Sequence, residues 1–262
     1  MLTDVEVALT AVSAGADIVR RRFGGELRRL DKGHGDFATD VDIAAEEAIV
    51  EIIRTERPDD SIHAEESGAT GRSGNHRTWL VDPICGTTNY YAGTGPVAVN
   101  VALNQNDRPI AGAVADPLVN EIYWTDGRTS VRRHDQVDRA LQPSSRSKLI
   151  DINMDPPFPN RDWFRPHVLA SDETFTQWFE PRVVSSTIAL TWVATGQRAA
   201  YVTDGGLLGS VHFAAALAIC EAAGVVMTNL AGGSIHTGVE GLLAAADQET
   251  HQQLTEIVNA VP

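Results

Sequence analysis

The chain of 262 residues is poor in cysteine and in basic residues, and it has no long apolar run. Its two cysteines, Cys85 and Cys220, are too few for a disulfide framework and are typical of a reducing compartment. The longest unbroken apolar run, Phe213 to Cys220, is too short for a membrane-spanning helix. The first ten residues contain acids where a secretory signal contains basic residues, so no export signal is expected. These absences predict a soluble, cytoplasmic protein.

Negative charge is in excess. The 21 Lys and Arg residues are outnumbered by 35 Asp and Glu residues, which gives a net charge of −14. Because a phosphate backbone or an anionic membrane would repel such a chain, neither a nucleic acid nor a membrane is an expected partner. Hydrophobic residues make up 43% of the sequence, which is enough for one large core or for two halves.

Helical and strand patterns alternate along the chain. A capping-box pattern at Thr3 and Glu6 predicts a helix that ends at Gly24, and Thr39 is expected to cap a second helix. The predicted buried face of the first helix consists of Val5, Leu9, Val12, Ala16 and Val19. The remaining predicted elements are strands at 79–82, 97–103, 109–115 and 199–203, helices at 187–195 and 213–223, strands near 225 and 242, and a last helix from about 247.

This alternation is typical of a mixed α/β (α+β) fold. The Pro-, Ser- and Arg-rich stretch from about 142 to 166 is the expected seam between an N-terminal half (about 1–141) and a C-terminal half (about 142–262) of one fold spanning 1–262.

Three segments resemble the motifs of one enzyme family. They are DFATDVDIAAEE (36–47), the pair Glu65-Glu66 followed by WLVDPICGTTNY (79–90), and VHFAAALAICEAAG (211–224). In order and spacing they are similar to the D-x-x-T-x-x-D, W-x-x-D-P-[IL]-D-G-T-x-N-[FY] and W-D-x-A-A-x-x-x-x-x-E-A-G-G motifs of the inositol monophosphatase superfamily. The resemblance implies an αβαβα layered sandwich, a possible homodimer and, in ordinary members, Mg²⁺-dependent phosphate hydrolysis.

Carried over by position, the resemblance implies metal ligands at Glu65 and Asp82 and an outer carboxylate at Asp42. It also implies phosphate contacts at Gly86 and Thr87, where a turn enters a helix whose N–H groups attract anions.

The chain departs from the family pattern at Cys85 and His212, which occupy positions of two aspartates that bind the same second metal. A thiol and an imidazole are poor ligands for Mg²⁺. Because both residues replace ligands of one ion, they are expected to meet within proton-transfer reach. A thiolate beside an imidazole at a helix N-terminus predicts a cysteine nucleophile. Asp82 and Asp116 are the two acids that could orient the imidazole, and Asp116 is preferred.

A Cys–His–Asp site on this scaffold resembles the off-loading Dieckmann cyclases of polyketide and antibiotic biosynthesis. The resemblance implies that Cys85 takes a carrier-bound β-ketoamide thioester as an acyl-Cys intermediate and releases it as a tetramate or pyridone ring. His212 would act as the base, and the N–H groups of Gly86 and Thr87 would form the oxyanion hole. The expected partner is an acyl or peptidyl carrier protein. Neither a metal nor another cofactor is expected, so Glu65 and Asp42 would be remnants of a metal site.

Two alternatives stay open. The first is a divergent metal-dependent phosphatase acting on a sugar or inositol phosphate with Mg²⁺ or Zn²⁺, since Cys, His, Asp and Glu together form a plausible zinc set. The second is a non-catalytic relative. Cys220, on an apolar helix face, is expected to be a buried core residue.

Overall fold

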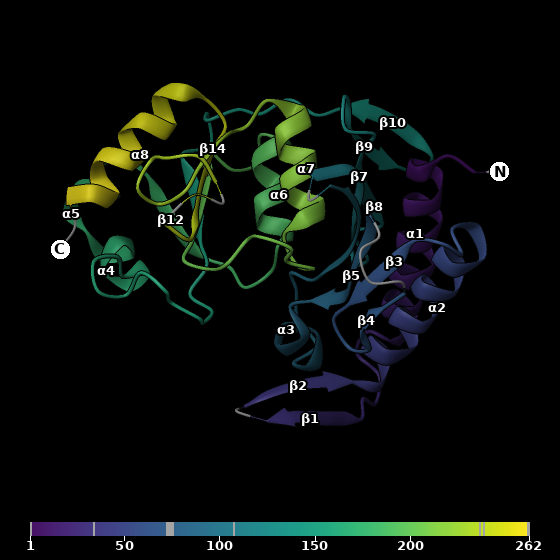
Figure 1. Cartoon of the computed structure of the whole chain (residues 1–262). Helices are drawn as coiled ribbons and strands as arrows, with labels where there is room; N and C mark the ends of the chain where they lie inside the picture. The colour runs from purple at the N-terminus through teal and green to yellow at the C-terminus, as the bar shows by residue number, and fades with distance from the viewer. Residues whose placement is uncertain are drawn as a thin grey trace. The chain divides into compact units, whose positions relative to one another are not determined.

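The computed structural model describes residues 2–33, 35–71, 76–106, 108–235, 237 and 239–260, and Figure 1 shows the chain as two compact units. The first unit comprises Met1–Ala140, Ser186–Ile188 and Val211–Ile219. The second comprises Leu141–Ser185, Ala189–Ser210 and Cys220–Pro262. Each unit has its own sheet and its own hydrophobic core.

An eight-stranded sheet forms the centre of the first unit. Its order is β10 (Val137–Ala140), β9 (Ser130–His134), β8 (Glu121–Thr125), β7 (Arg108–Asp116), β6 (Ala98–Gln105), β5 (Arg77–Cys85), β3 (Ser61–Ala64) and β4 (Gly68–Thr70). Only β3 and β5 pair in parallel among these described strands. The carboxyl ends of β3 and β5 therefore lie at the same edge of the sheet. A separate hairpin consists of β1 (Arg29–Gly33) and β2 (Asp36–Thr39).

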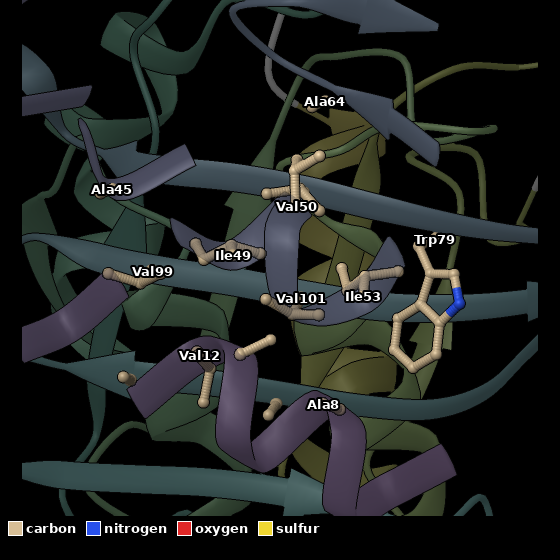
Figure 2. Close-up of a cluster of buried hydrophobic side chains, with 14 of the residues drawn as sticks. Ala8, Val12, Ala45, Ile49, Val50, Ile53, Ala64, Trp79, Val99 and Val101 are labelled. Carbon is tan, nitrogen blue, oxygen red and sulfur yellow. The ribbon is translucent and has the colours of Figure 1, made fainter. Parts of the chain in front are cut away.

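Two helices cover one face of this sheet. In α1 (Asp4–Arg22) the capping box between Thr3 and Glu6 is present, and in α2 (Asp40–Glu56) Thr39 accepts hydrogen bonds from backbone amides of the first turn. Both predicted helix starts are thus confirmed. Apolar side chains of α1 and α2 meet those of β5 and β6 (Figure 2). The labelled cluster includes Val12, Ile49, Ile53, Trp79, Val99 and Val101.

The predicted buried face of α1 is only partly right. Val12 and Val19 are fully buried, but Val5, Leu9 and Ala16 are partly exposed. The helix instead buries Val7, Ala8, Ala11 and Gly15 together with Val12 and Val19. Gly15 lies against Ile49, where an added Cβ would come within 2.6 Å of that side chain, so the small residues of α1 let α2 approach closely.

On the opposite face of the sheet lies the first part of α7 (Ala214–Ala223). Gly112 of β7 makes this approach possible, because a Cβ at this position would lie 3.2 Å from Cα of Ala215. The hydroxyl of Ser130 on β9 donates a hydrogen bond to the carbonyl of Ile219 (2.9 Å). These contacts fix the segment that begins directly after His212.

The second unit has a five-stranded sheet of order β12 (Glu180–Val183), β11 (Leu149–Ile152), β13 (Ala200–Thr203), β15 (Leu242–Ala245) and β14 (Val226–Thr228). The first three are parallel, and β15 is antiparallel to both of its neighbours. The helix α8 (Gln248–Ala260) packs on β14 and β15. The other helices are α4 (Pro166–Ser171), α5 (Glu173–Trp178) and α6 (Ile188–Ala194), which has only its first residue in the first unit.

The mixed α/β fold predicted from the sequence is confirmed, with helices packed on a sheet in each unit. Cys220 is fully buried, as predicted. Within the described residues, no helix has the length and apolar composition needed to cross a membrane. A cytoplasmic location stays a prediction.

Replacing Ile49 by alanine is expected to lower the free energy of unfolding by about 2–5 kcal/mol, because it leaves a cavity where α1, α2 and β6 meet. Ile52→Ala on the same helix is the matched control, since Ile52 is only partly buried. Urea denaturation followed by circular dichroism measures both. Equal losses for the two variants would contradict this description of the core.

Candidate active site

The site lies where β3 and β5 end. The amide of Glu65, the first residue after β3, donates to the carbonyl of Val81 (3.0 Å), so Glu65 lies beside the strand position of Asp82. Asp82 is fully buried. Three residues later β5 ends at Cys85, and Gly86 (φ +103°) turns the chain into α3 (Thr87–Tyr91). Glycine is favoured here because this backbone conformation is left-handed.

Asp82, Cys85 and His212 come together, although 130 residues separate the first from the last. One ligand atom from each lies within 4.8 Å of the others. Nδ1 of His212 is 2.7 Å from Oδ2 of Asp82. The sulfur of Cys85 accepts a hydrogen bond from the amide of Thr187 (3.2 Å). The expected meeting of Cys85 and His212 is therefore present in the structure.

The preference for Asp116 as the acid that orients the imidazole is wrong. Oδ1 of Asp116 accepts hydrogen bonds from the amides of Leu118 (3.0 Å) and Val119 (3.3 Å), so this carboxylate closes the turn after β7. Asp82 is the carboxylate in contact with His212.

Asp82 has a further partner, Asn100, that the sequence patterns did not predict. Nδ2 of Asn100 lies 3.3 Å from Oδ2 of Asp82 and 3.1 Å from Oγ1 of Thr187. Asn100 is a fully buried polar residue between Val99 and Val101 in the first part of β6. A polar residue within this apolar run is the signal that could have identified it.

The charge of Asp82 determines the protonation of its neighbours. Burial lowers the pKa of His212, but the charge of Asp82 and hydrogen bonds to Asp82 and Cys85 outweigh burial and raise it to about 12. The Asp82 carboxylate therefore favours the protonated form of the imidazole.

The pKa of the Cys85 thiol is raised, first by burial and then by the charge of Asp82, in spite of hydrogen bonds from His212 and Thr187 that lower it. This is opposite to the readily ionised thiol expected from the sequence. The five-residue helix α3 that follows is too short to offset the effect of a buried carboxylate.

Two further acids and a lysine border the cluster. Nζ of Lys32, on β1, donates to Oε1 of Glu65 (3.2 Å) and to Oε1 of Glu66 (2.6 Å). Burial, and next the charge of Asp82, raise the pKa of Glu65 to about 9. Among the described residues, no hydrogen-bond partner reaches Oε2 of Glu65 or Oδ1 of Asp82, both of which are buried. The pair is short of positive charge at these two oxygens, and a bound cation would supply it.

Asp42 and Thr87 form the other side of the site. Oδ2 of Asp42 accepts from the amide and hydroxyl of Thr39 at the start of α2 (2.8 and 2.5 Å). The hydroxyl of Thr87 lies 3.2 Å from Oδ1 of Asp42 and 2.9 Å from the carbonyl of Ile84. Burial raises the pKa of Asp42.

Comparison with known proteins identifies the fold and the family. The model of the inositol monophosphatase family matches residues 2–262. The chain belongs to the inositol monophosphatase family. It is 32% identical over 277 residues to an inositol-1-monophosphatase of Synechocystis sp., which covers 99% of this chain and 90% of the relative. It is 28% identical over 260 residues to a Nus factor SuhB of Pasteurella multocida, which covers 97% and 95%.

A fructose-1,6-bisphosphatase/inositol-1-monophosphatase of Aquifex aeolicus is 39% identical over 122 residues, so the chain spans about half the length of that relative (46%). Among solved structures, an inositol monophosphatase from Anabaena superposes with a TM-score of 0.81 at 24% identity and covers 98% of this chain and 96% of its own. At this level of identity the superposition shows the fold alone.

These findings overturn the functional expectation. The family model covers nearly the whole chain, and full-length relatives are named inositol-1-monophosphatase or SuhB. The expectation of a metal-independent Dieckmann cyclase of polyketide or antibiotic biosynthesis, with Cys85 as an acyl-transfer nucleophile, is wrong. Burial and the charge of Asp82, which raise the pKa of the Cys85 thiol, also disfavour a nucleophilic thiolate. The carrier-protein partner and the homodimer stay predictions.

Asp82→Asn is expected to lower the pKa of His212 well below about 12, because the charge and hydrogen bond of Asp82 are the largest effects that oppose burial. Imidazole resonances followed by NMR against pH, with a chelator present, measure this shift. Since the folded pKa is raised, the Asp82–His212 contact stabilises the protein fully below pH 6.5, and this contribution is lost as the pH rises toward 12. The control is His251, whose pKa burial lowers and which should titrate alike in both proteins.

Cys85 in the metal-free protein is expected to react with iodoacetamide at pH 7 no faster than a free cysteine, because its thiol pKa is raised. Peptide mass spectrometry of the alkylated chain gives the rate at each thiol, and Cys85→Ala leaves the buried Cys220 as the reference. Rapid alkylation of Cys85 at neutral pH would show that the thiol is ionised after all.

Proposed function

We propose that this protein is a metal-dependent phosphatase that hydrolyses phosphate monoesters of inositol or a related sugar. The family match and the names of the relatives support the reaction and the substrate class. The proposal depends on one structural observation. Glu65 and Asp82 each have a buried side-chain oxygen that has no hydrogen-bond partner among the described residues.

Glu65 and Asp82 would hold a divalent cation. Two neighbouring buried carboxylates repel each other unless a cation or a proton neutralises one of them. The raised pKa of Glu65 results from burial and from this repulsion. Both offer the hard oxygen donors that Mg²⁺ prefers. The bound cation would lower the pKa of a water molecule and neutralise charge on the phosphate.

We further propose that Cys85 and His212 replace two aspartate ligands of the motifs that the sequence resembles. The support is their position in those motifs and the distance of no more than 4.8 Å between their ligand atoms and that of Asp82. The site would then combine an oxygen-donor pair, Glu65 and Asp82, with a thiol and an imidazole.

Thr87 and Asp42 would move the proton. The Thr87 hydroxyl has one proton, which it can donate to Oδ1 of Asp42 (3.2 Å) or to the carbonyl of Ile84 (2.9 Å), and its oxygen can accept a hydrogen bond from a water. A water that attacks phosphorus would pass its proton to Oγ1 of Thr87, and Thr87 would pass its own to Oδ1 of Asp42. The bond from phosphorus to the sugar oxygen would break as the new one forms, and the leaving oxygen would take a proton from solvent. Burial raises the pKa of Asp42, which makes this carboxylate a better proton acceptor than an exposed aspartate.

Phosphate release from inositol 1-phosphate and fructose 1,6-bisphosphate, assayed with Mg²⁺ and with a chelator, tests the proposed function. Glu65→Gln and Asp82→Asn each remove a charged cation ligand and are expected to lower kcat/KM by more than the ~10–100-fold that is typical of residues supporting a metal ligand. Glu47→Gln, on the exposed side of α2, is the matched control and should keep full activity. Activity that persists in the chelator or in Asp82→Asn, or no phosphate release from either ester, would contradict the proposal.

Thr87→Val removes the hydroxyl between the water and Asp42 and is expected to lower kcat by about 10²–10⁴-fold with a smaller change in KM. Thr87→Ser keeps the hydroxyl and should restore most of the rate. An equal loss in Thr87→Ser, which keeps the hydroxyl, would contradict this role of the hydroxyl.

A further inference from the structure

The cluster at the end of β5 joins donors of three kinds. Asp82 offers a carboxylate oxygen, Cys85 a sulfur and His212 a ring nitrogen, and all three atoms lie within 4.8 Å of one another. Sulfur and imidazole nitrogen are softer donors than the oxygens that Mg²⁺ requires, and they are the donors most frequent in zinc sites. The donor set therefore fits a different ion from the one that Glu65 and Asp82 would select alone.

A second observation indicates a cation at this place. Asp82 is fully buried, and its Oδ1 has no hydrogen-bond partner among the described residues, while Oδ2 contacts His212. A buried carboxylate oxygen without a donor is costly in a folded protein. Metal coordination satisfies such an oxygen without a hydrogen-bond donor.

Access to the cluster is compatible with a reactive metal site. The side chain of His212 is 44% exposed, although Asp82 beside it is fully buried. Zinc sites with three protein ligands leave one position for water or substrate, whereas purely structural zinc sites have four. The described residues offer three such donors here.

We propose that Asp82, Cys85 and His212 form a zinc-binding site, with Cys85 bound as the thiolate. Binding releases the thiol proton and one ring proton of His212 to solvent. The inference rests on the proposed function, because it assigns a second, softer ion to the same site. The two can still fail separately, since zinc affinity is measured without substrate and phosphate release is measured with Mg²⁺.

Cobalt substitution provides a direct readout of the sulfur ligand. The full chain, stripped of metal, is titrated with Co²⁺, and a near-ultraviolet sulfur-to-cobalt charge-transfer band is expected to saturate at one ion per chain. Zinc added afterwards should displace the cobalt and remove the band. Absence of the band, or no zinc uptake in equilibrium dialysis with elemental analysis, would overturn the proposal.

Two variants locate the site. Cys85→Ser is expected to abolish the band and to weaken zinc binding at least tenfold, whereas Cys220→Ala removes the other, fully buried thiol and should leave both unchanged. Cys85→Asp supplies a hard oxygen and is expected to weaken zinc and strengthen Mg²⁺ relative to the parent chain. Circular dichroism verifies the fold of each variant, and the cobalt spectrum of the parent chain decides the question if a variant does not fold. A band that survives Cys85→Ser, or one that Cys220→Ala abolishes, would refute the assignment.

Discussion

Two acidic side chains, Glu65 and Asp82, lie side by side where β3 and β5 end, the only parallel pair among the described strands of the large sheet. The cost of burying two neighbouring negative charges determines which groups surround them. Glu65 and Asp82 are held there by the backbone, because β3 and β5 end at the same edge. Lys32 reaches Glu65 from a separate hairpin, and His212 reaches Asp82 from the opposite face of the sheet. Each brings positive charge to the pair, yet one oxygen of each acid stays without a donor among the described residues.

The same constraint explains why a thiol beside an imidazole does not by itself make a cysteine nucleophile. A reactive thiolate requires surroundings that are on balance positive. Asp82 is close enough to hold His212 as a cation and to oppose ionisation of Cys85. The chemistry of the cluster is thus set by the buried carboxylate that all its members share, and a metal ion fits that charge balance better than a nucleophile does.

Local sequence signals predicted much of the fold, because the interactions behind them are local. The helix starts at Thr3 and Thr39 depend on contacts within four residues and could be predicted. The buried face of α1 could not, because apolar and small residues occur on more than one side of that helix and only packing against α2 selects among them. The meeting of Cys85 and His212 followed from motif positions. The choice of Asp82 over Asp116 did not, because both acids lie near the ends of strands of the same sheet. Only the structure shows that Asp116 accepts hydrogen bonds in the turn after β7, whereas Asp82 contacts His212.

Gly112 shows that a residue outside the Asp82–Cys85–His212 cluster affects the geometry of that cluster. It lies on β7 without any polar group of its own to contribute, yet the backbone of α7 lies directly against it. A single methyl group at this position would push Ala215 outward, and the chain just before α7, which includes His212, would be displaced with it. The position of the imidazole therefore depends, through a shift of a few tenths of an ångström, on a residue that carries no side chain.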